Sequence, residues 1–362
     1  MQLFLELLQV SLGTRDYLSR EPSESEWGRI FELAEIQTIA GILIDGIELL
    51  PSNQRPPTDL LLEWIGITQI IENQYHVHKA VAQKTYDCLR AGHIDVAFMK
   101  GLVCGARYPH PEHRQSGDID FVVADKDFPK ALDKLEEIGT VDRELVHEHH
   151  GMVYVGDVNL EPHYKVHNYQ NPKVDKAMRD IFDGVFPQSL VEVKVGELML
   201  PAFPPAFECA LLVGHMVNHV YAEGLGMRQV VDFMIFLQKE HETIKTDDCR
   251  RYLKMMRMER AFRIFACLCE DALGMSHELL GLRYSFKEKK FANKLLADIL
   301  KVGNFGRGAD YLGQNRFLVP IKSYFWVFGR CVTLGYLCPA EARWWPVSKF
   351  VRYFRGKILK KR

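Results

Sequence analysis

Two aspartates, Asp118 and Asp120, follow a glycine in the segment GDIDFV at residues 117–122. The β-branched and aromatic residues around them favour a strand, and side chains two residues apart on a strand share a face. The two carboxylates are therefore expected side by side, while Ile119 enters the core. Neighbouring like charges repel unless a cation lies between them, and oxygen ligands favour Mg²⁺ or Mn²⁺. The spacing predicts a divalent-metal site of the kind used in phosphoryl and nucleotidyl transfer.

The residues around this pair resemble a known family. The matching residues are Lys100-Gly101, Tyr108-Pro109, Arg114 and Gly117-Asp118-Ile119-Asp120. They are similar to the pattern KG…YP…R…GDID of a bacterial family of uncharacterised nucleotidyltransferases in the DNA polymerase beta superfamily. The resemblance implies a nucleotidyltransferase fold that binds an NTP. One position departs from the superfamily: Leu102 follows Gly101, where a second small residue usually completes the turn that holds the triphosphate.

A third carboxylate is implied by the resemblance, and Glu161 is the candidate. In the segment NLEPHYK at residues 159–165, strand alternation puts Glu161, His163 and Lys165 on one face. Pro162 indicates an edge strand or a bulge, because proline cannot donate to a sheet ladder. A solvated glutamate on such an edge is the alternative. We predict Glu161 as a metal ligand or general base and His163 as a substrate-binding neighbour.

Cations and glycines near the aspartates are the predicted phosphate contacts. Lys100 and Arg114 precede the pair in sequence, and arginine offers a planar fork of donors that suits phosphate. Gly101 would let the backbone approach a triphosphate, and Gly117 is predicted to bind substrate with it. For Lys100 the alternative is an ordinary surface charge that pairs with a nearby carboxylate.

Histidines form two further groups. The segment HEHH at residues 147–150 is expected to be a loop beside the active site rather than a zinc site, because consecutive residues rarely converge on one tetrahedral ion. His215 and His219 are spaced i, i+4 on a predicted helix, without the glutamate of a zinc protease motif, so helix packing or an active-site rim is expected. Arg228 and Asp232 have the same spacing and are expected to pair or to line the acceptor pocket.

Composition limits the classes of function. The chain has 362 residues, of which 47% are hydrophobic and 26% charged, as in a globular protein of two or three domains. A formal net charge of -1 gives no overall basic field, so a small-molecule or protein acceptor is favoured over nucleic acid. The eight cysteines lack paired metal spacing and are typical of reduced, cytosolic residues. With no signal-peptide pattern and no apolar run near the roughly 18 residues of a membrane span, we expect a cytoplasmic protein.

Periodicity divides the chain into three parts. Helical patterns fill residues 1–74, mixed helix and strand patterns fill 75–201, and helical patterns return over 202–362. The middle part is expected to begin with a helix near residues 75–91 and to end with a hairpin at Val191–Leu200 that has Gly196 in its turn. The predicted class is α+β. A polymerase-beta-like nucleotidyltransferase core, with a small mixed sheet and flanking helices, is expected between N-terminal and C-terminal helical domains.

The C-terminal segment from Arg343 to Arg362 contains eight basic residues and no acidic residue, with aromatic residues interleaved. This composition is typical of a helix that binds a membrane interface or nucleic acid. A terminal helix that packs its aromatics, Trp344 included, and leaves a basic end in solvent is the alternative that we favour. We therefore expect at most a weak surface contact.

The function predicted from these observations is metal-dependent transfer of a nucleoside monophosphate from an NTP, such as ATP, to a hydroxyl acceptor, with release of pyrophosphate. Asp118, Asp120 and Glu161 would bind the metal. Two rivals stay open. One is a non-catalytic nucleotide-binding or scaffold protein that keeps the fold, in line with Leu102 at the turn. The other is a toxin-like enzyme that modifies transfer RNA through a basic groove.

Overall fold

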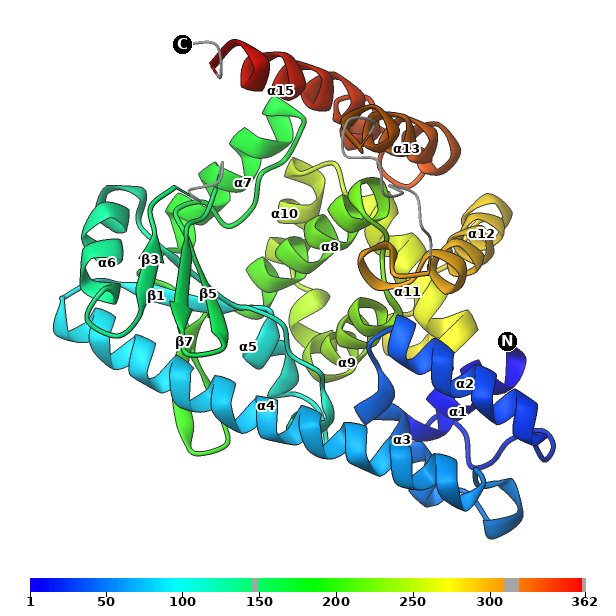
Figure 1. Ribbon diagram of the computed structural model, residues 1–362. Coiled ribbons are helices and arrows are strands. Elements are labelled where there is room, and N and C mark those ends of the chain that lie inside the picture. The colour runs from blue at the N-terminus through cyan, green and yellow to red at the C-terminus, as the bar shows by residue number, and fades with distance from the viewer. Residues whose placement is uncertain (145–148, 309–318, 360–362) are drawn as a thin grey trace.

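The structure, a computed structural model, describes residues 1–144, 149–308 and 319–359. Helices at the start of the chain lead into a sheet with its own helices, and a larger helical part follows (Figure 1). The predicted α+β class, with a mixed sheet between helical modules, is confirmed. His147 and Glu148 of the predicted histidine loop lie outside the described residues.

Four α-helices precede the sheet. They are α1 (Gln2–Ser11), α2 (Glu24–Ile36), α3 (Ala40–Leu49) and α4 (Thr58–Ala91). The start of α2 is fixed by a capping box, in which the Ser23 hydroxyl accepts from the N–H of Glu26 and the Glu26 carboxylate accepts from the N–H of Ser23.

Helix α4 is 34 residues long, which corresponds to about 50 Å. Its buried residues follow one face at helical spacing: Trp64, Thr68, Ile71, Tyr75, Ala82, Thr85 and Leu89. Trp64 makes edge contacts with Trp27 and Phe31 in the N-terminal helices, whereas Tyr75 and Leu89 pack against the sheet. The boundary predicted between residues 74 and 75 therefore lies inside a continuous helix (Figure 1). The helix expected to begin near residue 75 is the second half of α4 and not a separate helix.

Seven strands of the described chain form one mixed sheet in the order β3-β4-β5-β2-β1-β7-β6. Their bounds are β1 (Val96–Met99), β2 (Ile119–Val123), β3 (Thr140–Asp142), β4 (Met152–Val155), β5 (Val158–His163), β6 (Val191–Val195) and β7 (Leu198–Ala202). Strand β2 is antiparallel to β1 and parallel to β5. Pro162 was expected to mark an edge strand or a bulge, but β5 lies between β4 and β2 and its register with β2 runs unbroken through Pro162. The Pro162 carbonyl accepts from the N–H of Gly151 at 2.9 Å.

The remaining α-helices lie, in sequence, between the strands or after the last strand. They are α5 (Gly101–Gly105), α6 (Phe128–Leu135), α7 (Pro172–Val185), α8 (Pro205–Ala222), α9 (Met227–Ile244), α10 (Asp247–Met255), α11 (Glu259–Leu273), α12 (Phe286–Val302), α13 (Val319–Leu334), α14 (Pro339–Ala342) and α15 (Trp345–Leu359). Among the described residues, no helix is both long enough and apolar enough to cross a bilayer.

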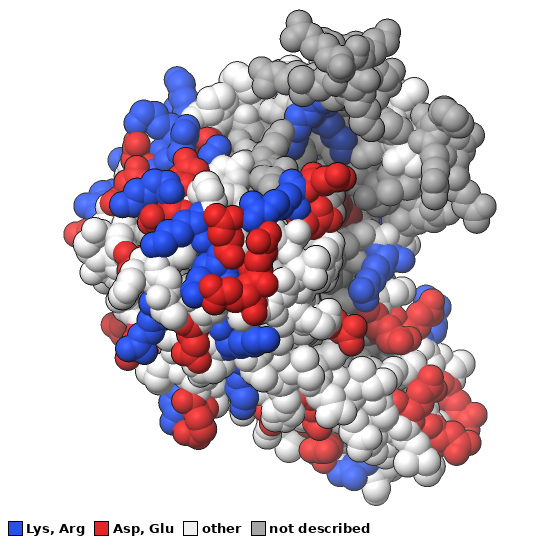
Figure 2. All heavy atoms as spheres, turned by 60° about the vertical axis from the view of Figure 1, so that its left-hand side comes forward, with Lys and Arg blue, Asp and Glu red and all other residues white. Residues whose placement is uncertain are grey.

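Both faces of the sheet are buried. One face packs against α4 and α6 through residues such as Phe98, Phe121 and Leu160. The other face contributes Val122 to a larger core that the N-terminal and C-terminal helices share. The two predicted helical domains thus pack into one core in space, although the sheet separates them in sequence. Basic and acidic side chains are interspersed on the face shown in Figure 2, in keeping with the small net charge.

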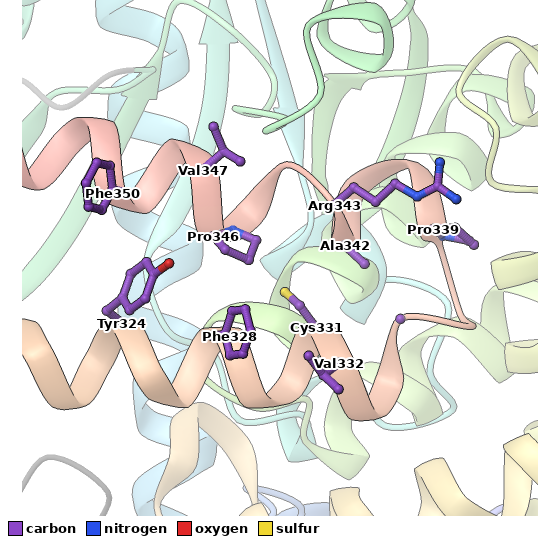
Figure 3. Close-up of a pocket in the computed structure, with 11 residues that line it drawn as sticks. Tyr324, Phe328, Cys331, Val332, Pro339, Ala342, Arg343, Pro346, Val347 and Phe350 are labelled. Atoms are coloured by element: carbon purple, nitrogen blue, oxygen red, sulfur yellow. The ribbon is translucent and has the colours of Figure 1, made fainter.

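Helices α13 and α15 lie side by side, with a groove of about 640 Å³ between them (Figure 3). Phe328 and Phe350 line it and are 46% and 53% exposed. The expectation that Trp344 packs in the core is wrong, since Trp344 is 41% exposed and Trp345 is 6% exposed. Trp344 lies in the turn between α14 and α15, whereas Trp345 is the first residue of α15 and belongs to the larger core.

This difference predicts unequal effects of two neighbouring substitutions. Trp345→Ala should lower the free energy of unfolding by roughly 3 kcal/mol, because it opens a cavity in a packed site. Trp344→Ala should cost clearly less, since part of that side chain already contacts solvent. Denaturant unfolding of both variants checks this, and equal losses would contradict the assigned burial.

Candidate active site

The predicted carboxylates converge on one cavity. Asp120 in β2 and Glu161 in β5 are register partners in the parallel pair, so their side chains lie next to each other on the same face of the sheet. Asp118 lies directly before β2, where the Asn159 amide donates to its Oδ1 at 3.2 Å. All three carboxylates line a cavity of about 350 Å³.

Lys100 neutralises one of these carboxylates. Its ammonium group donates to Asp120 Oδ1 at 2.9 Å from the turn between β1 and α5. The backbone of Lys100 has φ 55°, in the left-handed region that non-glycine residues rarely adopt, and Gly101 follows at φ 22°. Strained backbone of this kind is concentrated at functional sites. The alternative of an ordinary surface charge does not fit Lys100, because its side chain is only 14% exposed.

His163 is the second partner of Asp120. Its Nε2 lies 3.0 Å from Asp120 Oδ1 and 3.6 Å from Glu161 Oε2, and the residue is 1% exposed. Burial raises the pKa of Asp120, but Lys100 and His163 outweigh burial and hold that pKa well below its usual range. Asp118 differs, because burial raises its pKa and the charges of Glu161 and Asp120 raise it further. The two aspartates therefore lie in opposite electrostatic surroundings.

Arg114 is buried and held by a carboxylate. Its Nε and Nη2 donate to the two oxygens of Asp232 in α9, at 2.6 and 2.8 Å. The Tyr108 hydroxyl donates to the same carboxylate at 2.7 Å. Arg114 lines the cavity, but two of its three nitrogens are engaged in tying its loop to α9.

Arg228, in α9, is a further cation that lines the cavity. The predicted pairing of Arg228 with Asp232 is replaced by the Arg114–Asp232 pair, although both residues of α9 line the cavity as the alternative expectation had it. Arg228 donates to the carbonyl of Gln115 at 2.7 Å, while its Nε is buried with no partner among the described residues. Burial lowers the pKa of Arg228 to about 10. Its charge is thus less compensated than that of Arg114.

The residues of the predicted phosphate turn differ in whether they reach the cavity. Leu102, the departure from the superfamily pattern, is buried in the core against the sheet and does not line the cavity, whereas Gly101 and Gly117 do. The carbonyl of Gly117 accepts from His78 Nε2 at 2.7 Å. Helix α5 begins at Gly101 and is only five residues long.

Histidines from three segments complete the cavity wall. They are His149, His150, His163, His167, His215 and His219. His215 and His219, expected to pack a helix or to lie at an active-site rim, line this cavity, and their Nε2 atoms lie 3.1 Å apart. His167 was not predicted as part of the site, because no sequence spacing links it to the other histidines. Burial lowers the pKa of His149 to about 2 and those of His167 and His219 to about 3, so these rings are neutral at pH 7.

The arrangement suits chemistry on a phosphorylated substrate, since oxygen ligands and buried cations share one cavity. In comparisons with known proteins, residues 23–274 match a family described as uncharacterised nucleotidyltransferase. No curated protein matches the chain. A crystal structure of an antigenic nucleotidyltransferase-like protein from Paracoccidioides brasiliensis is similar at 13% identity and a TM-score of 0.33, over 57% of this chain and 96% of that one. The family match spans most of the sequence and includes every residue of the cavity named above, and on that basis the chain belongs to the uncharacterised nucleotidyltransferase family.

Proposed function

We propose that the protein transfers a nucleoside monophosphate from an NTP to a hydroxyl acceptor and releases pyrophosphate. The convergence of Asp118, Asp120 and Glu161 on one cavity beside Lys100 carries this proposal. Membership of a nucleotidyltransferase family supports it. A cytoplasmic location and a small-molecule or protein acceptor stay predictions.

The three carboxylates fit a hard divalent cation. Asp118, Asp120 and Glu161 offer oxygen donors only, which favours Mg²⁺ or Mn²⁺. The raised pKa of Asp118 indicates that its negative charge is not fully compensated by protein groups, as expected where a cation would bind. Such an ion, when bound, would neutralise the charge that develops on the phosphates and acidify the acceptor hydroxyl.

In the transfer, the acceptor oxygen forms a bond to the α-phosphorus, and the bond from that phosphorus to the β-bridging oxygen breaks. Pyrophosphate leaves with the electron pair of the broken bond. Glu161 would accept the hydroxyl proton as general base. His163, which donates to Asp120, would hold that carboxylate in place and contact the substrate.

Phosphate binding would rest on the buried cations of the cavity. Lys100 and Arg228 are the strongest candidates, because the first is only singly paired with a carboxylate and the second has a buried, unpartnered Nε among the described residues. Gly101 and Gly117 would let the backbone approach the phosphates. Arg114 would contribute charge from the wall, although Asp232 already engages two of its nitrogens.

Magnesium should tighten nucleotide binding. Titrating the protein with a non-hydrolysable NTP analogue, with and without Mg²⁺, should show this effect in the wild type. Asp118→Asn, which removes a charged ligand but keeps the shape, should abolish it. Asp125→Asn, an exposed carboxylate just after β2, is the matched control and should behave as wild type. Equal Mg²⁺ dependence in wild type and Asp118→Asn would refute the metal assignment.

Glu161→Gln should slow transfer by roughly 100-fold or more and leave NTP affinity nearly unchanged, because a general base acts in the transition state. The measurement follows α-labelled NTPs onto candidate acceptors, which are small molecules, proteins and transfer RNA, together with pyrophosphate release. Glu192→Gln, on an exposed position of β6, is the control. Near-normal turnover of Glu161→Gln would move the base to another residue, and no release from wild type with any NTP would favour the non-catalytic rival.

Arg228→Ala should weaken binding of the NTP analogue by about tenfold or more, since a hydrogen bond to a charged group contributes roughly 1.5–3 kcal/mol. Arg179→Ala, on the exposed face of α7, should bind like wild type. Calorimetry of the two variants decides this, and unchanged affinity in Arg228→Ala would assign Arg228 a structural role.

A further inference from the structure

Three imidazoles come together next to the carboxylates. His149 and His150 precede β4, and His163 ends β5. One ring nitrogen from each lies within 4.8 Å of the others. The ring centroids of His149 and His150 are 4.4 Å apart, and that of His150 lies 5.0 Å from His163. Consecutive histidines were not expected to share one ion, but here the bridge between His150 and His163 brings the third ring close to both.

Two of these rings have nitrogens that nothing described satisfies. The Nδ1 atoms of His149 and His163 are buried and have no hydrogen-bond partner among the described residues. A buried polar atom without a partner costs about 1–3 kcal/mol, so the unpartnered Nδ1 of His163 calls for a ligand. His149 faces His150 through its other nitrogen, since His149 Nε2 lies 3.1 Å from His150 Nδ1. A neutral imidazole nitrogen that is not protonated is a metal ligand.

The protein already orients one of the rings. The Nε2 of His163 donates to Asp120 at 3.0 Å, which leaves Nδ1 as the unprotonated nitrogen. Metal-binding histidines commonly donate their other ring nitrogen to a carboxylate in this way, which fixes the tautomer and makes the ring a better ligand. Asp120 thus serves His163 from the side away from the proposed ion.

We propose that His149, His150 and His163 bind a transition-metal ion, with zinc as the first choice, at a site separate from the carboxylate oxygens that would take Mg²⁺. Nitrogen donors favour zinc and its neighbours over magnesium. A tetrahedral zinc places two nitrogen ligands roughly 3.3 Å apart for Zn–N distances of about 2.0 Å. His149 Nε2 and His150 Nδ1, which lie 3.1 Å apart, are already close to this separation, and the third nitrogen lies within 4.8 Å of the other two.

Three protein ligands leave one position of a tetrahedral ion open. The three rings line the same cavity as Asp118 and Glu161, so that position faces the proposed substrate site. Open coordination is the mark of zinc sites that meet substrate or water, whereas structural sites are closed by four protein ligands. The zinc site does not depend on the proposed transfer reaction, because its ligands are tested by binding alone.

The test is zinc binding by the full chain after chelator treatment, in buffer with saturating Mg²⁺ to occupy oxygen sites. Calorimetry should show stoichiometric zinc, and X-ray absorption at the zinc edge should show imidazole scattering. His149→Ala and His150→Ala should each lower zinc affinity by about 100-fold or more, since loss of even an indirect partner commonly costs 10–100-fold. Absence of stoichiometric zinc, or a spectrum with oxygen ligands alone, would overturn the proposal.

Two controls keep the outcome specific. His215→Ala removes an imidazole from the same cavity but outside the group of three and should leave zinc affinity unchanged; an equal loss there would overturn the assignment of ligands. Asp118→Asn should keep zinc binding while it loses nucleotide transfer, which separates failure of the zinc site from failure of the proposed function. If a histidine variant does not fold, the wild-type absorption spectrum decides between imidazole and oxygen ligands.

Discussion

The charge of Asp120 must be compensated, because this carboxylate is enclosed between the sheet and the C-terminal helices. Lys100 and His163 provide the compensation, one from the turn after β1 and the other from the end of β5. Each partner is fixed by strand register: Asp120 pairs with Met99, the residue before Lys100, and with Glu161, two residues before His163. Without this register the cavity would contain a buried, unpaired charge, which is far more costly than the hydrogen bonds that hold the strands. The pairing of the central strands therefore also determines which groups surround Asp120.

Local patterns predicted the elements that depend on nearby residues. The strand after Gly117, the hairpin of β6 and β7 around Gly196 and the helices after Pro205 follow from alternation, turn chemistry and helical spacing. Helix α4 was predicted as two separate helices. Nothing in the sequence between Ile71 and Tyr75 shows that one helix face packs into two different cores. The burial of Trp345 rather than Trp344 was not predicted either, because it depends on how the turn before α15 packs on the larger core, which the neighbouring sequence does not reveal.

The candidate site was predictable where a short motif carried it. Asp118, Asp120 and Glu161 were found from strand spacing and resemblance, and the structure brings them to one cavity. The partners could not be found in this way. Asp232 lies 118 residues after the Arg114 that it holds, and the cavity histidines come from three segments between residues 149 and 219. Contacts of this kind arise when helices α8 and α9 cover the sheet, so they follow from the packing of layers rather than from any local pattern.

The spacing of residues along helix α4 keeps two buried segments on the same face. Trp64, Thr68 and Ile71 pack into one core and Tyr75, Ala82 and Leu89 into another, all on a single face. An insertion or deletion of one residue between Ile71 and Tyr75 would rotate one half by about 100° relative to the other and turn a buried face into solvent. The length of α4 can therefore change there only in steps that restore the phase, such as seven residues, which is close to two full turns. In this way a periodicity in the first quarter of the sequence limits which insertions and deletions this chain would tolerate.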